Sequence, residues 1–321
     1  MRATRFLLFL LVSVAMQCAS GGDYPARAVR IVVPFPAGAT NDIVARLFAQ
    51  QLAAQTGQAF VVDNRPGGNG IPGADAVAKA TPDGYTLLLG NTSLLGIHVS
   101  LYDKLPYDPR AFVPVSVLAI SPSVLLLNPA VPANSTAELV DYARTNPGRL
   151  NYASAGRGTP FHLYAELFKE QTGTELVHIP YKGSAPALVD LLAGRVQVMF
   201  DNIPSALPYI RDGKLRAIAT TGAKRLPLLP EVPTLSEAGL KNAASTSWFA
   251  IAAPGGTPRE TLVRLHAEIA RAGAAPEVRQ RLLDLGAEPI VNSPEEAAAH
   301  VRAEISKWAK VIERAGARVN D

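Results

Sequence analysis

Cysteine is almost absent from this sequence of 321 residues, because the only one is Cys18. Arg2 and Arg5 precede a short apolar run that ends in small residues, which is the pattern of a cleavable signal peptide over residues 1–22. Its removal would take Cys18 away and exclude disulfides and cysteine-ligated metals. The residue before Cys18 is a glutamine, which fits poorly at a lipidation site. We therefore expect a periplasmic protein without a lipid anchor.

Other features are also missing. No later stretch of about 18 apolar residues could span a bilayer, so we expect the mature chain to be soluble. The net charge is only +4, basic and acidic residues are interspersed, and aromatic residues make up 7%. These features argue against nucleic acid and membrane surfaces as partners. The length and the hydrophobic content of 48% are sufficient for two lobes of roughly 100 to 170 residues.

Catalytic and metal-binding motifs are poor. The histidines, which are His98, His162, His178, His266 and His300, lack the spacing of metal ligands. Tyr152 stands where a nucleophile elbow around Ser154 would need glycine. Gly68-x-Gly70-x-x-Gly73 matches a dinucleotide fingerprint, but Pro72 removes an amide and no acidic residue ends the next strand. We interpret it as a flexible loop. We expect no enzyme, cofactor or metal, with an exported hydrolase using Ser154 or His162 as a remote alternative.

Strand-like and helix-like segments alternate along the chain, which predicts an α/β protein. Strands are expected at 29–33, 60–63, 85–89, 150–153, 176–180, 196–200 and 215–220, and helices at 42–56, 73–80, 135–144, 160–171, 184–192, 258–271 and 294–315. Ser135, Thr257 and Ser293, each followed three residues later by glutamate, predict capping boxes. Extended segments at 112–127 and 244–253 are predicted to connect two lobes, formed by 23–121 with 248–321 and by 122–247. Ligands of open α/β sheets bind at the carboxyl ends of the strands, so the cleft between the lobes is the expected site.

The stretch 31–46 joins a β-branched run to an amphipathic helix through a Pro/Gly turn. Free amides and the positive end of the dipole at such a helix start suit a carboxylate or phosphate. The alternative is an ordinary turn in which Asp42 merely complements the dipole. The loop 154–159 repeats this chemistry with two hydroxyls, glycines and Arg157. Arg157 either contacts the ligand or is a solvated loop cation.

Three further positions follow predicted strands. The cluster 91–93 is either a helix cap or part of the site. Lys182 and Asp201 either approach the ligand or form a structural ion pair. His162, in the first turn of a helix, is either a ligand contact or a cap or core residue, and His178 is expected to pack within its strand.

Six motifs together resemble a known family, the extracytoplasmic solute-binding proteins of tripartite tricarboxylate transporters, often called the Bug family. They are YPARAVRIVVPFPAGATND, NRPGGNGIPGADAVAKATPDGYTLLLG, LYDKLPYDP, NYASAGRGTPFHLYAELF, IPYKGSAPALVDLLAGRVQVMFDN and LPEVPTLSEAGL, in that order. The resemblance covers essentially the whole mature chain. It implies a type II periplasmic binding protein fold whose two lobes close on a small carboxylate.

The resemblance also implies a set of site residues and partners. One ligand carboxylate would be held by backbone amides of 36–40 and 154–159, and the expected ligand-binding residues are Phe35, Ala37, Gly38, Ala39, Thr40, Asp42, Ser93, Ser154, Gly156, Arg157, Gly158, Thr159, His162, Tyr181 and Asp201. Ala39 replaces a second glycine common in the family, and Arg157 replaces a neutral residue. Expected partners are a small organic anion (a di- or tricarboxylate, an acidic amino acid or an aromatic carboxylate) and membrane permease subunits. A sensor kinase is the alternative partner, and the protein is expected to be a monomer.

Overall fold

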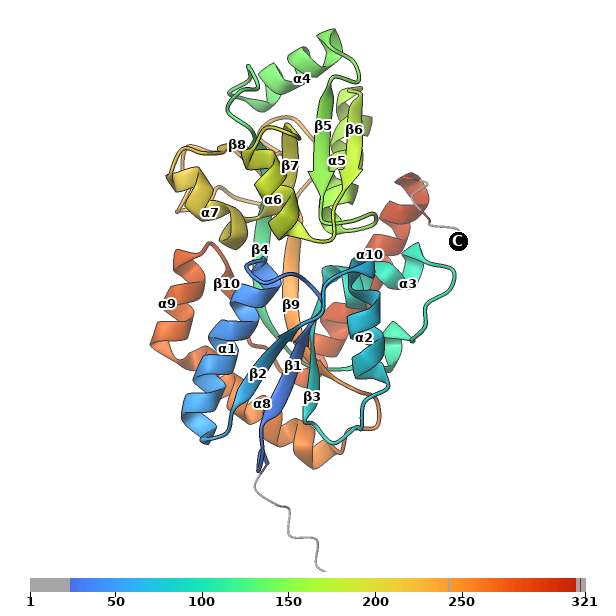
Figure 1. Ribbon diagram of the computed structural model, residues 1–321, viewed down its shortest axis with the longest axis vertical. Coiled ribbons are helices and arrows are strands. Elements are labelled where there is room, and N and C mark those ends of the chain that lie inside the picture. The colour runs from blue at the N-terminus through green and yellow to red at the C-terminus, as the bar shows by residue number, and fades with distance from the viewer. Residues whose placement is uncertain (1–23, 242, 316–317, 319–321) are drawn as a thin grey trace, which may run out of the picture.

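A computed structural model of the protein describes residues 24–241, 243–315 and 318. The predicted signal peptide and Cys18 lie outside these residues. Two α/β lobes are stacked along the long axis and are connected by the extended strands β4 and β9 (Figure 1). The expected fold class is confirmed. Within the described ranges, the helices are all too short or too polar to cross a membrane.

The elements follow the alternation expected from the sequence. The strands are β1 (Val29–Val33), β2 (Phe60–Asn64), β3 (Thr86–Asn91), β4 (Val113–Leu127), β5 (Leu150–Ser154), β6 (Leu176–Pro180), β7 (Val198–Asn202), β8 (Arg216–Thr220), β9 (Thr246–Ala253) and β10 (Glu288–Pro289). The helices are α1 (Thr40–Thr56), α2 (Ile71–Ala78), α3 (His98–Leu101), α4 (Thr136–Thr145), α5 (Pro160–Thr172), α6 (Ser184–Leu192), α7 (Ile203–Arg211), α8 (Arg259–Ala274), α9 (Pro276–Asp284) and α10 (Pro294–Ala315).

One sheet runs through both lobes, in the order β2-β1-β3-β9-β4-β7-β5-β6, with β8 and β10 also paired to β4. β4 pairs with β9 from Val113 to Pro122 and with β7 from Ser123 to Leu127. It therefore changes partner at one point along its length. β1, β2 and β3 run parallel in the lower lobe of Figure 1, and β5, β6 and β7 run parallel in the upper lobe. The carboxyl ends of each parallel set face the other lobe.

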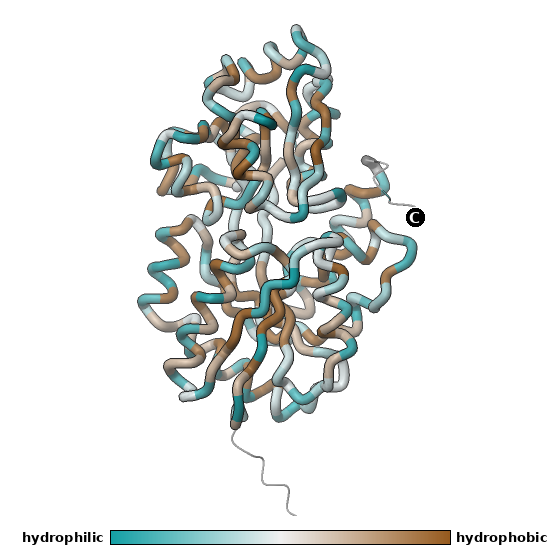
Figure 2. Tube along the Cα trace, in the orientation of Figure 1, coloured by the Kyte–Doolittle hydropathy of each residue, from teal (hydrophilic) through white to brown (hydrophobic). Residues whose placement is uncertain are grey.

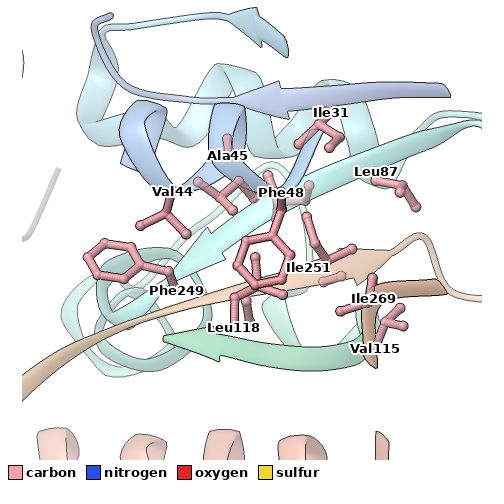
Figure 3. Packing of buried hydrophobic residues seen from close by; sticks show 14 of the residues in the cluster. Ile31, Val44, Ala45, Phe48, Leu87, Val115, Leu118, Phe249, Ile251 and Ile269 are labelled. Carbon is pink, nitrogen blue, oxygen red and sulfur yellow. The ribbon is translucent and has the colours of Figure 1, made fainter. Parts of the chain in front are cut away.

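Buried apolar side chains hold each lobe together. In the lower lobe, Phe48 of α1 packs among Leu118 of β4 and Phe249 and Ile251 of β9 (Figure 3). In Figure 2 brown stretches run along strands in the middle of the lower lobe, and brown and teal alternate along the surrounding helices, which is the pattern of a sheet covered by amphipathic helices. Two further clusters form the upper lobe, one on each face of its sheet.

The C-terminal helix α10 ties the two lobes together. Trp308 and Ile312 of α10 belong to an apolar cluster of the upper lobe, whereas Ala297 and Val301 belong to the lower one. Glu304, which is 9% exposed, accepts hydrogen bonds from the indole N–H groups of Trp248 at 3.0 Å and Trp308 at 2.9 Å. One buried carboxylate oxygen therefore joins a connecting strand to this helix.

Several local expectations need correction. The capping boxes at Ser135 and Ser293 are confirmed, because each hydroxyl accepts the N–H of the glutamate three residues later. The box at Thr257 is wrong, because its hydroxyl donates to the Pro254 carbonyl oxygen at 2.8 Å and α8 has no side-chain cap. The 68–73 segment is a 3₁₀ turn that leads into α2, and a Cβ on Gly73 would lie 2.9 Å from Pro34 Cβ. These glycines allow close packing, and the segment is helical instead of the loop that was expected.

Replacing Glu304 with leucine tests whether its hydrogen bonds to the two tryptophans stabilise the protein. The Glu304→Leu variant leaves two buried indole N–H groups without their acceptor, and each such loss costs about 1–3 kcal/mol. We expect a fall of about 2–4 kcal/mol in the free energy of unfolding, measured by urea denaturation. The control Arg302→Leu, on the exposed side of the same helix, should stay within about 0.5 kcal/mol of wild type. Equal stabilities of the two variants would contradict the assignment.

Candidate functional site

A small cavity lies between the lobes, at the carboxyl ends of both sets of parallel strands. It offers about 20 Å³ of space for the centres of water molecules, which is enough for one or two of them. Its lining combines apolar side chains with hydroxyls and amides: Phe35, Ala39, Thr40, Asn41, Asn91, Thr92, Ser93, Ala155, Thr159, Pro160, Phe161, Ser184, Asn202, Ser247 and Phe249. Residues of both lobes and of β9 thus enclose one space.

Four helices begin at this cavity. α1 starts at Thr40, α5 at Pro160 and α6 at Ser184, all of which line it, and α7 starts directly after Asn202. None of the four has a hydrogen bond from its N-cap side chain to its first amides. The first turn of a helix leaves N–H groups unpaired and carries about half a positive charge. The cavity therefore lies in a positive field that comes from both lobes.

The lining contains no lysine, arginine or histidine, so peptide dipoles supply this positive field. Ser247 of β9 adds a hydroxyl that is only 4% exposed and has no hydrogen-bond partner among the described residues. Asn91 Oδ1 accepts the N–H groups of Ser93 and Leu94, so the segment 91–93 is a helix cap as well as part of the lining. Such an arrangement suits a small anion.

The loop between β1 and α1 is shaped by Asp42. Its carboxylate accepts hydrogen bonds from the Gly38 N–H, from Arg46 Nε and from Asn64 Nδ2, each at 3.0 Å. Burial opposes ionisation of Asp42, but these hydrogen bonds outweigh it and hold the pKa of the carboxyl below its usual value. Gly38 adopts a φ of 80°, which favours glycine. Asp42 therefore fixes the loop from behind instead of facing the cavity.

The opposing loop, 154–159, is held by two stacked imidazoles. His178 Nε2 lies 2.7 Å from Ser154 Oγ, and His162 Nδ1 accepts the Gly158 N–H at 3.1 Å. The two rings stack with centroids 4.4 Å apart. Burial, together with the charges of His162 and Arg157, lowers the pKa of His178 to about 3. Neutral imidazoles therefore fasten this loop, and His178 does more than pack within β6.

Asn69, in the turn before α2, connects the lobes. Its Nδ2 donates to the Arg157 carbonyl oxygen at 2.8 Å and to Tyr102 Oη at 2.6 Å. A Cβ on Gly156 would come within 2.0 Å of Asn69 Oδ1. Only glycine leaves room at Gly156 for this contact. The loop of the upper lobe is thus seated directly on Asn69 of the lower lobe.

Asp201, at the end of β7, is 1% exposed and accepts hydrogen bonds from Ser184 Oγ at 2.7 Å and Ser205 Oγ at 2.8 Å. Thr40 Oγ1 in turn donates to Ser205 Oγ at 3.1 Å, across the boundary between the lobes. Burial raises the pKa of Asp201 to about 6, although these hydrogen bonds favour its charged form. The expected alternative of an ion pair with Lys182 is not what the structure shows, because hydroxyls surround Asp201 and Lys182 is exposed.

The predicted ligand-binding residues fall into two groups. Those that line the cavity are Phe35, Ala39, Thr40, Ser93 and Thr159. Those that lie around or behind this lining are Ala37, Gly38, Asp42, Ser154, Gly156, Arg157, Gly158, His162, Tyr181 and Asp201. Among the latter, Arg157 is exposed, and Tyr181 donates its hydroxyl proton to Asp190 at 2.7 Å. Whether each contacts a ligand stays a prediction.

Several residues of the cavity were not among the residues predicted from the sequence. Ser247 and Phe249 come from β9, which was expected only to connect the lobes, and Phe161 is an ordinary apolar residue of α5. No local pattern distinguishes these side chains. Asn69 has a detectable signal, since an asparagine between two glycines favours the left-handed turn that it adopts, with a φ of 52°.

The fold and the site define a class, the two-lobed periplasmic solute-binding proteins. The sequence profile described as "Tripartite tricarboxylate transporter family receptor" matches residues 44–317. The chain belongs to this family, which consists of periplasmic receptors of tripartite tricarboxylate transporters and not of enzymes. The resemblance to the Bug family is confirmed.

Relatives resemble the chain over nearly its whole length. BugT of Bordetella pertussis is 38% identical and covers 99% of this chain and 100% of its own, and a protein from the tcbD–tcbE intergenic region of Pseudomonas sp. strain P51 is 43% identical, covering 90% and 86%. The structure of R. palustris Rpa4515 with adipate has a TM-score of 0.90 at 42% identity, covering 92% and 100%. MatC from Rhodopseudomonas palustris with bound malate has a TM-score of 0.85 at 36% identity, covering 90% and 100%.

Removing the Asn69 side chain tests whether its hydrogen bond helps to hold the two lobes together. Asn69→Ala loses a hydrogen bond between the lobes that is worth about 1 kcal/mol, so ligand affinity should fall roughly fivefold. Titration calorimetry with a carboxylic acid that stabilises the wild-type protein against heat would measure this change in affinity. The control is Asn146→Ala. The side chain of Asn146 donates a hydrogen bond to the Tyr142 carbonyl oxygen of its own lobe, so this variant should bind the ligand with wild-type affinity. Unchanged affinity of Asn69→Ala would show that this hydrogen bond between the lobes does not contribute to ligand binding.

The raised pKa of Asp201 predicts a pH dependence of stability. The native state holds a proton on this carboxyl up to about pH 6, whereas the ordinary value is 3.8. Stability contributed by proton binding is therefore fully present below pH 3.8 and lost as the pH rises through 6. We expect Asp201→Asn to gain about 2–3 kcal/mol relative to wild type between pH 4 and pH 7, measured by urea unfolding of ligand-free protein. Parallel pH profiles would contradict the shift.

Proposed function

We propose that this protein is exported by its N-terminal peptide, binds a small carboxylate between its lobes and delivers it to the permease of a tripartite tricarboxylate-type transporter. The observation that carries the proposal is the convergence of four helix starts, α1 of one lobe and α5, α6 and α7 of the other, on one cavity without a cationic side chain. A carboxylate in this field would accept N–H groups from both lobes and hold them together.

Closure is part of the proposal. The cavity of about 20 Å³ is too small for a four-carbon dicarboxylate to enter and leave freely. We infer that the lobes, 23–121 with 248–321 and 122–247, part by bending of β4 and β9. The change of partner along β4 between Pro122 and Ser123 supports bending at this point. Adipate and malate, named in the titles of two related structures, support a carboxylate as the ligand.

A ligand panel tests the proposal directly. Protein unfolded and refolded to remove any resident ligand should be stabilised against heat by at least one acid from a panel of C3 to C6 mono- and dicarboxylates. Mass spectrometry of the small molecules released on the first unfolding would identify a resident ligand independently. A refolded protein that responds to none of these acids would contradict the proposal.

An acid placed at the start of α1 should compete with the ligand. Ala39 is the uncapped N-cap of α1 and lines the cavity, so Asp in Ala39→Asp would cap the helix and occupy the anion position. We expect at least 100-fold weaker binding with ligand-free stability unchanged or raised by about 1 kcal/mol. The control Ala275→Asp caps α9 away from the cavity and should bind normally. Wild-type affinity of Ala39→Asp would place the ligand elsewhere.

A further inference from the structure

Two histidines of the upper lobe fasten the loop 154–159 at both of its ends. Where the loop begins, His178 Nε2 of β6 lies 2.7 Å from Ser154 Oγ. Where it ends, His162 Nδ1 of α5 accepts the Gly158 N–H at 3.1 Å. The position of the loop therefore depends on the two imidazole rings behind it.

The fastened loop forms one wall of the cavity. Ala155 and Thr159 line the cavity, and the first turn of α5, with its unpaired amides, follows directly after Thr159. The Thr159 hydroxyl donates to the Gly156 carbonyl oxygen at 2.8 Å, so the loop is a tight turn. A displacement of Gly158 would therefore also displace the amides at the start of α5.

His162 can hold the loop only in its neutral form. Its Nδ1 accepts the Gly158 N–H, whereas a protonated imidazole carries an N–H on both ring nitrogens. Protonation would place two N–H groups against each other, on nitrogen atoms 3.1 Å apart. The loop would have to move away from the ring to relieve this contact.

A second proton on His178 has no acceptor in the observed arrangement. Its Nδ1 is buried and has no hydrogen-bond partner among the described residues, whereas Nε2 contacts Ser154 Oγ. The neutral ring can leave Nδ1 bare, but the protonated ring must place an N–H there. An unpaired buried donor is costly, so this site also favours the neutral ring.

The groups that face the pair come from three segments: Tyr152 from β5, Arg157 from the loop, and Glu166 and Lys169 from α5. Tyr152 stacks on His178 with ring centroids 4.7 Å apart, and the two imidazole centroids are 4.4 Å apart. A positive charge on one imidazole therefore disfavours a charge on the other. Glu166 favours charged rings, but its carboxylate is already paired with Lys169 at 2.8 Å.

Burial is the main cause that lowers the pKa of His162 below its ordinary value of 6.5. The cations Arg157 and Lys169 add to this effect, and Glu166 opposes it. Geometry and electrostatics thus agree that the observed loop requires neutral rings.

We propose that a proton and the carboxylate ligand compete for the loop 154–159: the ligand requires the loop as it is fastened by two neutral imidazoles, and protonation of the pair releases the loop and weakens binding. This inference rests on the proposed function of the cavity and adds its regulation by pH. His162 and His178 act through the loop and are positioning residues.

Parting of the lobes gives the proton its opportunity. Asn69 of the lower lobe donates to the Arg157 carbonyl oxygen at 2.8 Å and lies against Gly156. Both contacts are lost when the lobes part, so the ligand-free loop is free to move away from a protonated ring. The ligand-bound loop is not, because the lobes hold it between them.

Ligand binding should therefore release protons. A group whose pKa is lower in the bound state gives full affinity above its free value, here the ordinary 6.5, and loses affinity as the pH falls below it. For one proton shared by the pair, we expect affinity to fall about tenfold between pH 7.5 and pH 5.5.

Titration calorimetry of the refolded protein with succinate, L-malate and adipate, at pH 5.5, 6.5 and 7.5, measures this fall. The acids and Asp201 also titrate in or near this range, so each variant is compared with the wild type using the same acid. Titrations at pH 6 in two buffers of different ionisation enthalpy count the protons released. The wild type should release at least about half a proton more than His162→Asn.

Variants of the two histidines separate the position of the loop from its protonation. His162→Ala should bind at least fivefold more weakly than the wild type at pH 7.5. His162→Asn supplies an amide oxygen that accepts the Gly158 N–H without titrating, so it should recover most of this loss and reduce the fall in affinity at acidic pH at least threefold. His178→Gln keeps a polar group beside Ser154 and should reduce the fall in the same direction if the first variant does not fold.

His266→Gln is the control, because His266 lies in α8 of the lower lobe, and it should keep the pH profile of the wild type. A wild-type profile in both His162→Asn and His178→Gln would overturn this inference and leave the carboxylate receptor standing. Wild-type affinity of His162→Ala at pH 7.5 would overturn its positioning role. No binding of any acid of the C3 to C6 panel at pH 7.5 would overturn the proposed function and this inference together.

Discussion

The positive field at the boundary between the lobes is the constraint on which the structure depends. Four helix starts meet there, and each would leave unpaired N–H groups away from bulk solvent if nothing accepted them. The arrangement requires that strands β1, β5, β6 and β7 end at one level and that each is followed by a short loop or none. The parallel pairing of the strands provides this alignment. Sheet topology and anion recognition are thus two aspects of one arrangement.

Charged and titratable side chains near the cavity stabilise the loops that surround it. Asp42 is neutralised by the Gly38 amide, Arg46 and Asn64, and it fixes the loop before α1. His162 and His178 fix the opposing loop in their neutral forms. In the proposed function backbone amides recognise the anion, which leaves the side chains of the lining to distinguish one anion from another. Hydroxyls and amides from three strands contribute to that part of the cavity.

The sequence predicts the structure well where interactions between residues close in sequence determine it. The amphipathic pattern of α1 and the capping boxes at Ser135 and Ser293 predict observed helices. α7 was not anticipated, because Pro204 and Pro208 interrupt its pattern, although Pro204 in the first turn costs no hydrogen bond. α9 was missed because it follows α8 after the single residue Ala275. At Thr257, the nearby Pro254 carbonyl competed successfully for the hydroxyl.

In the cavity too, features set by nearby residues could be predicted, and features set by distant residues could not. The two loops before α1 and α5 could be found from their composition, and they do face one cavity. The contribution of β9 could not, because Ser247 and Phe249 acquire their positions only through pairing with distant strands. The hydroxyl chain from Thr40 to Ser205 joins residues that are 165 positions apart. Such a pair carries no signal in a single sequence.

The position of β9 between β3 and β4 has a consequence for the order of folding. Leu88 of β3 pairs with Ala252 of β9, so the lower lobe cannot complete its sheet until the chain beyond residue 250 has been synthesised. In contrast, β5, α5, β6, α6 and β7 follow one another within a continuous stretch of chain. Contacts between distant residues form slowly because a large loop must be closed first. The upper lobe is therefore placed to fold early, and the lower lobe is completed around its two connecting strands.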